Sequence, residues 1–348
     1  MTLQRTWKRS NSIIFFESLE SYLSAGLSLD TCIRMIGQSS ASYKKNVYTR
    51  MNEVIERGGL FSDALAETVS MHITTIHLIR HGESSGDLLR SITLARSLLE
   101  HQDELIKNCL SAMAYPCIIG FFAIVLVIGL IRGVMPQIIP MLIGLHVQLP
   151  ILTRIVISMS DITTKYGLYI VLGICVCISS FVFIYKRYEK CMYMCHVVIL
   201  HIPIIGKLVR SYATSVFLHS CGALLDSGVG ISKAYPSTTS TISVLPIRSY
   251  MSSFCTRIDN GAQLSSVFYH KVFPPYISAL ISAGESSGTL GQSCIRAALI
   301  TDRNMKHSLK RLTSLIEPIM MVGMGLIIGA IALSILMPIY DISKVLQK

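Results

Sequence analysis

The stretch Gly82-Glu83-Ser84-Ser85-Gly86-Asp87-Leu88 has a second copy in this chain of 348 residues. That copy, Gly284-Glu285-Ser286-Ser287-Gly288-Thr289-Leu290, follows 202 residues later. The same ungapped offset relates four further pairs of landmarks: Gly26 and Gly228, Gly59 and Gly261, Pro116 and Pro318, Met135-Pro136 and Met337-Pro338. So many matches at one offset indicate an internal duplication. The chain therefore consists of two copies of one unit, each a polar stretch followed by a long apolar stretch.

The composition is that of a membrane protein, with 51% hydrophobic and only 15% charged residues. A helix needs about 20 apolar residues to cross a bilayer. Three runs are long enough: 112–131, 167–185 and 318–339. The N-terminus does not resemble a signal peptide, because its apolar core, residues 13–16, is too short and acidic residues follow it.

The placement of charges predicts the orientation of these spans. Residues 1–111 carry 12 basic and 12 acidic residues, and residues 186–317 carry 14 basic and 6 acidic ones. The basic residues of the loop 132–166 are only Arg132, Arg154 and Lys165. Because basic residues favour the cytoplasmic side, both polar segments are predicted to be cytoplasmic. The excess positive charge next to the membrane favours contact with anionic lipid, and we expect no nucleic-acid partner.

The polar segments have the apolar spacing of short helices. Stripes at helical spacing begin with Phe16-Leu19-Leu23 and recur through residue 99, and Ser62 is a candidate N-cap for the fourth helix. The predicted fold class is an all-α membrane protein with two homologous cytoplasmic bundles of about six helices each and three transmembrane helices. The predicted order is: bundle 1–111, span 112–131, periplasmic loop 132–166, span 167–185, linker and second bundle 186–317, span 318–339, periplasmic tail 340–348.

The repeated stretch is predicted to be a tight turn between two helices. Gly82 suits a left-handed residue after a helix, and Ser85 can cap the next helix, with Asp87 in its positive first turn. Gly86 allows a close approach of the backbone. The equivalent residues of the second copy are Gly284, Ser287 and Gly288. This interpretation does not explain the glutamate.

Glu83 and Glu285 occupy the same place in the two copies, and two interpretations are open. Each carboxylate can bind neighbouring backbone amides, which is a structural role. Alternatively, each can face a partner protein. The span starts give further candidates, since Pro116 and Pro318 fit an early turn of a membrane helix as a fixed bend. Glu317 is either the last polar residue before the hydrocarbon or a contact for a partner in the membrane.

The sequence offers little chemistry. Leu78-Ile79-Arg80-His81-Gly82-Glu83-Ser84 matches the phosphohistidine signature of histidine phosphatases, but its lead-in is helical and the second copy lacks Arg and His. The spacings of His72, His77 and His81, and of His196 and His201, do not suit a metal site. The ten cysteines lack a zinc or disulfide pattern, and no phosphate loop or dinucleotide fingerprint occurs. We therefore predict no enzyme activity, no cofactor and no metal.

A small-solute transporter is the other alternative for a duplicated membrane protein. The three apolar runs contain no charged residue that would mark an ion or proton route. This observation favours a structural role over transport.

Several motifs together resemble the type II secretion F family, the inner-membrane platform proteins of type IV pilus and type II secretion machines. They are the duplicated helical segment, the repeated Gly-Glu-Ser-Ser-Gly-x-Leu, Tyr115-Pro116 and Glu317-Pro318-Ile319 at the span starts, and the terminal Met337-Pro338-Ile339-Tyr340. The resemblance covers about residues 10–348. The short segment before the first bundle is similar to that of type IVb pilus platforms.

The resemblance implies a multi-pass protein of the bacterial inner membrane, with a cytoplasmic N-terminus and a periplasmic C-terminus. Platforms of this family bind a hexameric cytoplasmic assembly ATPase and transmit its motion to pilins that leave the membrane. The implied partners are that ATPase, pilin and minor pilins, other inner-membrane assembly proteins, and further copies of the chain in a homo-oligomer.

Overall fold

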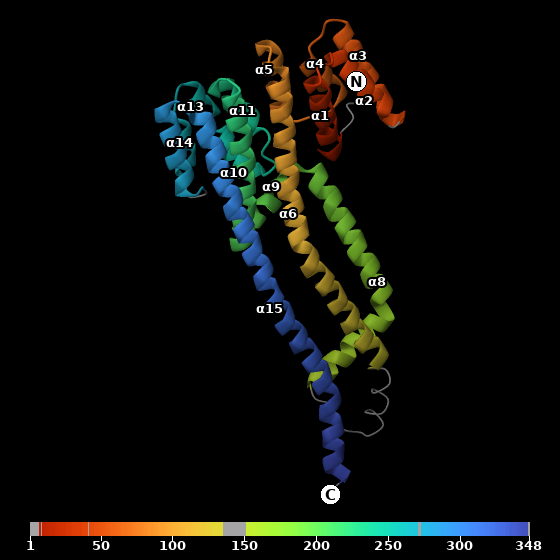
Figure 1. Ribbon diagram of the computed structural model, residues 1–348. Helices are drawn as coiled ribbons and strands as arrows, with labels where there is room; N and C mark the ends of the chain where they lie inside the picture. Colours follow the sequence, from red (N-terminus) through yellow and green to blue (C-terminus); the bar gives the residue numbers. More distant parts are fainter. Residues whose placement is uncertain (1–6, 8, 41, 135–150, 271–272, 347–348) are drawn as a thin grey trace. The chain divides into compact units, whose positions relative to one another are not determined.

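The computed structural model describes residues 7, 9–40, 42–134, 151–270 and 273–346, and within these ranges it is helical and contains no strand (Figure 1). Met135-Pro136 and the rest of 135–150, which belong to the predicted loop 132–166, lie outside the described residues. The chain forms two compact units. The first comprises Met1–Asn108 and Tyr193–Ser308, and the second comprises Cys109–Met192 and Leu309–Lys348.

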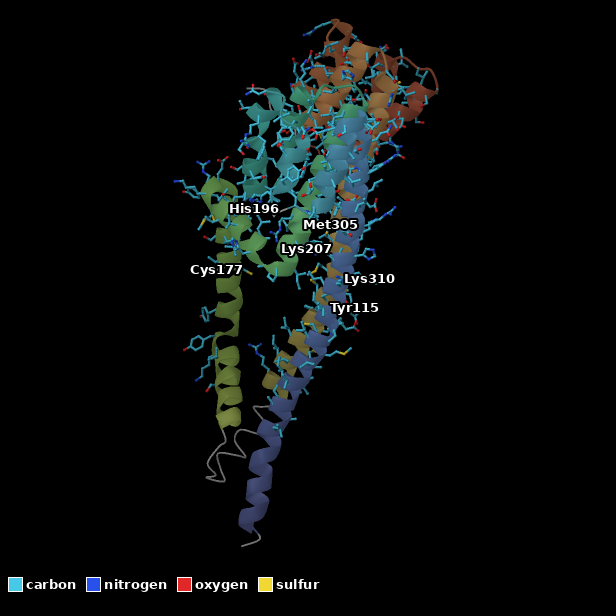
Figure 2. The ribbon with its side chains drawn as sticks, turned by 90° about the vertical axis from the view of Figure 1, so that its left-hand side faces the viewer. Tyr115, Cys177, His196, Lys207, Met305 and Lys310 are labelled. Atoms are coloured by element: carbon cyan, nitrogen blue, oxygen red, sulfur yellow. The ribbon has the colours of Figure 1, made fainter. Side chains whose placement is uncertain are left out.

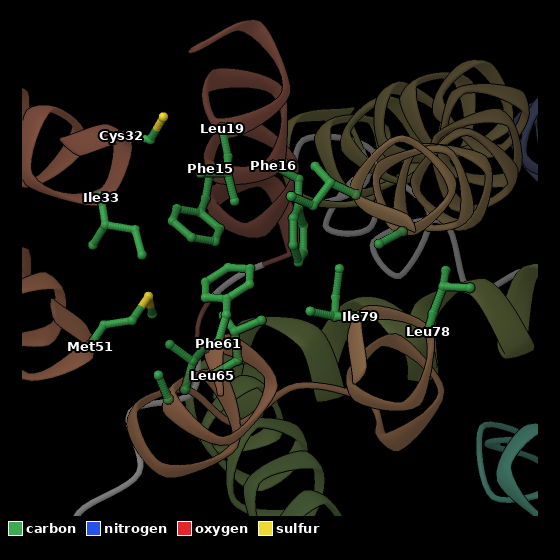
Figure 3. Close-up of a cluster of buried hydrophobic side chains, with 14 of the residues drawn as sticks. Phe15, Phe16, Leu19, Cys32, Ile33, Met51, Phe61, Leu65, Leu78 and Ile79 are labelled. Atoms are coloured by element: carbon green, nitrogen blue, oxygen red, sulfur yellow. The ribbon is translucent and has the colours of Figure 1, made fainter. Parts of the chain in front are cut away.

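In the described residues, the first repeat consists of six helices, as predicted. Their bounds are α1 Arg9–Ser24, α2 Leu29–Ser39, α3 Ser42–Glu56, α4 Phe61–Thr68, α5 Ile73–Ser85 and α6 Leu88–Gly129. The apolar stripes of these helices meet in one core, in which Phe15 packs its ring against Phe16 and Phe61 (Figure 3). A short π-helical segment, η1 Leu130–Val134, follows α6.

The second repeat follows the same plan at the same offset. Helices α8 Ile151–Arg187 and α9 Glu189–His201 precede it. Its elements are α10 Pro203–Asp226, α11 Ile231–Thr239, α12 Leu245–Ser252, α13 Cys255–Asp259, η2 Leu264–Tyr269, α14 Pro275–Ser287 and α15 Leu290–Leu346. The starts of α11, α14 and α15 follow those of α2, α5 and α6 by the offset that relates the two sequence copies. The copies differ locally: α12 and α13 replace the single helix α3, and the 3₁₀-helix η2 replaces α4.

The two repeats share a hydrophobic core. The core of the first repeat includes the buried side chains of Ala223, Leu224 and Ala234, which belong to the second repeat. Polar contacts also join the repeats: the Thr74 hydroxyl donates to the Ser237 carbonyl at 3.1 Å. The bundles are therefore one packed body rather than two independent domains, because the first core is incomplete without the second repeat.

Two helices are long and apolar enough to cross a membrane in the part of the chain described here, α6 and α15 up to Leu333. In the most apolar part of α6 no residue is buried, and in that of α15 very few are. The predicted second span, 167–185, lies within α8, whose apolar described part is Cys175–Tyr185. Long, exposed apolar helices are stable in hydrocarbon and not in water.

Helices α9 and α10, bent by 115° at their junction, are together also apolar enough to resemble a span. The apolar residues of α10 have another explanation, because Phe217, Leu218 and Cys221 are fully buried in the core of the second repeat. A helix whose apolar side chains are already covered by protein gains nothing from lipid. We therefore assign α10 to the packed body of the two repeats.

The shared core predicts that a change in the second repeat destabilises the first. Trp7 is the only tryptophan and packs on Phe15 and Tyr48, so its fluorescence reports unfolding of the first repeat. Leu224→Ala removes a buried side chain and should lower the free energy of unfolding by about 2–5 kcal/mol. Urea titration of the full chain in detergent, followed by Trp7 fluorescence, measures this loss. The matched control is Leu27→Ala at a partly exposed position. Equal urea midpoints for the two variants would contradict the shared core.

Candidate functional site

The repeated turn has the predicted residues, but the two glycines exchange the predicted roles. Gly82 lies inside α5, and Gly86 ends that helix in the left-handed conformation with φ +78°. The second copy agrees, with Gly284 inside α14 and Gly288 at φ +69°. The prediction of a left-handed Gly82 is therefore wrong. Helix α5 continues one turn beyond it, and the left-handed residue falls where α5 ends.

Gly82 and Gly284 instead allow two helices to approach closely. A Cβ atom on Gly82 would lie 2.2 Å from Ser91 Oγ and 2.5 Å from Ser91 Cβ. A Cβ atom on Gly284 would lie 2.3 Å and 2.4 Å from the same atoms of Ser293. Both serines sit in the first turn of the following helix, so each glycine–serine pair sets the helix-to-helix distance in its repeat.

The predicted cap at Ser85 is also wrong. Ser85 is the last residue of α5, and its hydroxyl donates to the Gly82 carbonyl at 3.4 Å. The equivalent hydroxyl of Ser287 donates to the Ala283 carbonyl at 2.9 Å. The cap of α6 is Asp87, whose Oδ1 accepts the Arg90 N–H at 3.3 Å. Asp87 directly precedes the helix, where a carboxylate can accept a free backbone N–H.

Glu83 binds backbone amides of a different helix from the one it belongs to. Its carboxylate accepts the N–H of Phe61 and, at 3.0 Å, the N–H of Ser62. These amides form the N-terminus of α4, where free N–H groups and the helix dipole favour negative charge. Ser62, predicted to cap α4, makes no such bond, and the position before the helix is Leu60. The α4 cap is therefore supplied by a side chain of the following helix, α5.

Glu285 repeats this arrangement in the second copy. Its carboxylate accepts the N–H of Leu264 and, at 3.2 Å, the N–H of Ser265 at the start of η2. Both glutamates are half-buried. The duplicated glutamate thus has the same structural bond in both repeats, even though α4 is an α-helix and η2 a 3₁₀-helix. Whether either glutamate also contacts a partner stays a prediction.

The other predicted residues lie away from these turns. Pro116 lies within the continuous helix α6, and Pro318 lies within α15, so neither stands near a helix start. A proline inside a helix removes one backbone hydrogen bond and favours a bend. Glu317 is exposed on α15. The structure therefore places Gly82, Glu83 and their second-repeat equivalents in the last turns of α5 and α14, and it does not bring Glu317 or the prolines to them.

Arg80 and His81 do not have the setting of a phosphohistidine site. Both lie in helix α5, whereas the phosphatase signature ends a strand. The Arg80 guanidinium pairs with the carboxylate of Asp63, and its Nε donates to Ser62 Oγ at 3.4 Å. Arg80 therefore ties α5 to the first turn of α4.

A cluster that the sequence analysis did not predict, with one buried and two partly buried residues, lies between the repeats. His101 is on α6, His219 on α10 and Asp302 on α15. Asp302 Oδ2 lies 3.0 Å from His219 Nε2 and 3.4 Å from His101 Nε2. The imidazole centroids are 3.8 Å apart. Figure 2 labels Met305, one turn after Asp302 on α15.

The carboxylate of Asp302 has a partner on each oxygen. The Ser215 hydroxyl donates to Oδ1, and the two histidines face Oδ2. Burial alone would raise the pKa of the Asp302 carboxyl, but the hydrogen bonds from His101, His219 and Ser215 lower it well below its ordinary value. The hydrogen-bond donors at both oxygens therefore favour the carboxylate form of Asp302 despite its burial.

These three residues could not be found by spacing, because they are far apart along the chain and belong to three different helices. The duplication supplies a weak signal. Asp302 is the repeat equivalent of Glu100, whose carboxylate pairs with Arg96 at 3.0 Å. The second repeat has Ala298 at the position equivalent to Arg96. Asp302 therefore has no arginine from that position as a counter-ion, which points to another partner.

The fold and these turns define a duplicated, all-helical membrane protein in which both copies use the same capped turn. The sequence matches the family described as "Type II secretion system (T2SS), protein F" over residues 15–136 and again over 217–338. The two matches are related by the same offset as the two repeats, and together they cover more than half of the chain. The chain belongs to this family.

Curated relatives agree with this assignment. The chain is 30% identical to the type IV pilus assembly protein PilC of Thermus thermophilus, covering 94% of this chain and 82% of that protein. It is 25% identical to PilC of Myxococcus xanthus, with 96% and 81% covered. It is also 25% identical to the type II secretion system protein F of Aeromonas hydrophila, with 97% and 88% covered.

The packing of Gly82 can be tested by a paired substitution. Gly82→Ala forces a methyl group against buried Ser91 and should lower the free energy of unfolding by about 1–3 kcal/mol. Combining it with Ser91→Gly removes the clash and should recover part of that loss. Urea titration of the full chain measures both. A paired variant as unstable as the sum of its single variants would contradict the proposed contact.

The cap made by Glu83 can be tested separately. Glu83→Ala leaves two backbone amides of α4 without their acceptor and should cost about 1–3 kcal/mol. Glu83→Gln keeps one acceptor oxygen and should cost less. Hydrogen exchange of the Phe61 and Ser62 amides provides a local readout and should accelerate more in Glu83→Ala. Unchanged exchange in that variant would show that water or another group caps α4 equally well.

Proposed function

We propose that this chain is the inner-membrane platform of a type IV pilus or type II secretion assembly machine. The observation that carries the proposal is the family match to both repeats, at the offset that relates their helices. Curated relatives that align over nearly the whole chain are named as pilus assembly or type II secretion proteins.

The shared core supports a three-span topology. Two bundles that share one core must lie in one compartment. If α6 crosses the membrane after the first bundle, the chain must cross back before the second, and the apolar part of α8 is suited to that crossing. With α15 as the third span, the termini lie on opposite sides. The positive charge of 186–317 favours a cytoplasmic N-terminus and a periplasmic C-terminus.

The platform acts as a mechanical part rather than as an enzyme. The packed cytoplasmic body binds the hexameric assembly ATPase, and the spans transmit its motion to pilin and minor pilins. Other inner-membrane assembly proteins, lipid and further copies of the chain complete the set of partners. Helices α6 and α15 suit this role, since each continues without interruption from a polar, core-forming part into an apolar stretch.

Neither alternative function has a specific observation in its favour. A histidine phosphatase would need Arg80 free to bind phosphate, and Arg80 pairs with Asp63. A transporter would need polar groups within the apolar runs. Purified protein without phosphatase turnover, and reconstituted vesicles without solute uptake, are the expected outcomes.

The proposal predicts specific neighbours in native membranes. Crosslinking followed by mass spectrometry should connect residues 1–111 or 186–317 to an assembly ATPase, and the chain to pilin-like proteins. A strain without the gene should lack its surface filaments or fail to secrete. Normal filaments and normal secretion in that strain, or crosslinks to neither partner in filament-making cells, would overturn the platform function.

The partner role of the glutamates has its own test. Glu83→Ala and Glu285→Ala should each leave membrane insertion intact. Assembly at normal protein levels would show that the carboxylates serve only as caps. Loss of assembly with normal levels and normal hydrogen exchange elsewhere would support a partner contact. Glu67→Ala, at an exposed glutamate near the end of α4, is the control.

A further inference from the structure

We propose that His101, His219 and Asp302 bind a divalent transition metal ion, with zinc the best fit, and that the ion joins the two repeats. Their three ligand atoms lie within 4.8 Å of one another. They come from α6 of the first repeat and from α10 and α15 of the second. An ion held by all three would therefore link the copies at a point remote from their turns.

The distances suit the geometry of zinc. Zinc binds imidazole nitrogen and carboxylate oxygen at about 2.0–2.2 Å, so two ligand atoms of a tetrahedral site lie about 3.4 Å apart. Asp302 Oδ2 lies 3.0 Å from His219 Nε2 and 3.4 Å from His101 Nε2. Small side-chain movements would bring all three atoms onto one ion. Two imidazole ligands favour zinc, copper, nickel or cobalt over magnesium or calcium, which prefer oxygen.

The surroundings are those of a built site. Asp302 is 6% exposed, and its second oxygen accepts the Ser215 hydroxyl, which fixes the carboxylate and leaves Oδ2 for the ion. One helical turn further along α6 and α15, buried Leu105 and Met305 pack with Val216 into an apolar layer. A ligand set beside an apolar layer binds a cation more strongly, because the local dielectric constant is low.

The duplication gives an independent reason for a cation here. In the first repeat, Glu100 has Arg96 as its counter-ion at 3.0 Å. The second repeat has Ala298 in place of that arginine and keeps an acid, Asp302, which faces His219 of the same repeat and His101 of the first. The two imidazole rings, with centroids 3.8 Å apart, place two nitrogen ligands beside this one carboxylate. One divalent ion shared by both rings would balance the carboxylate charge in place of the arginine.

The test measures zinc binding to the full chain, purified in detergent with an affinity tag that contains no histidine. Protein is stripped with a chelator, dialysed against zinc chloride and analysed for bound metal. Wild-type protein should hold one more equivalent of zinc than Asp302→Asn. His219→Gln should weaken binding at that site at least about 100-fold, and Ser215→Ala about 10-fold. The control is His307→Ala, which removes an exposed histidine on α15 and should leave zinc binding unchanged.

Two further measurements keep the result independent of variant folding. Cobalt added to stripped wild-type protein should give the visible absorption of a tetrahedral nitrogen and oxygen site. Zinc should also slow hydrogen exchange in α6 near His101 and in α10 near His219. Equal zinc content in wild-type protein and Asp302→Asn, both with native Trp7 fluorescence, would overturn the proposal. Loss of all bound zinc after the cysteine thiols are blocked would also overturn it. No part of this test depends on filament assembly.

Discussion

The structure depends on one packing constraint, the burial of Leu224 and its neighbours from the second repeat in the core of the first. Because the two copies share apolar surface, neither can be treated as a separate domain. The constraint also limits the topology, since groups that pack together must lie in one compartment. The proposed route through α6, α8 and α15 satisfies this constraint.

Much of the fold could be predicted from the sequence. The apolar stripes indicated the six helices of the first repeat, and the repeat offset indicated the starts of α11, α14 and α15. The exchanged roles of Gly82 and Gly86 could not be predicted. A glycine that ends a helix and a glycine that allows a second helix to pack closely are the same residue in a sequence. What separates them is Ser91, whose contact with Gly82 exists only after the helices pack.

The candidate sites show the same limit of sequence reasoning. The repetition of Glu83 and Glu285 identified both residues as candidates. Their carboxylates cap the start of the preceding helix in the chain, α4 in the first repeat and η2 in the second. In the first repeat, the sequence had assigned that cap to Ser62. His101, His219 and Asp302 gave no local signal, since they meet only through the packing of α6, α10 and α15. Motifs within one helix or turn are visible in a sequence, whereas sites built by long-range packing are not.

The shared core has a consequence for how the protein is made. The first repeat is synthesised to residue 108 well before Ala234 exists, so its core stays incomplete until the second repeat has been made. At about 5–20 residues per second, the remaining stretch takes on the order of 6–25 s to translate. During that interval the apolar surface that Leu224 and Ala234 later cover lacks its native partner. The interval between the synthesis of the two repeats is then the period in which this chain is most prone to misfold.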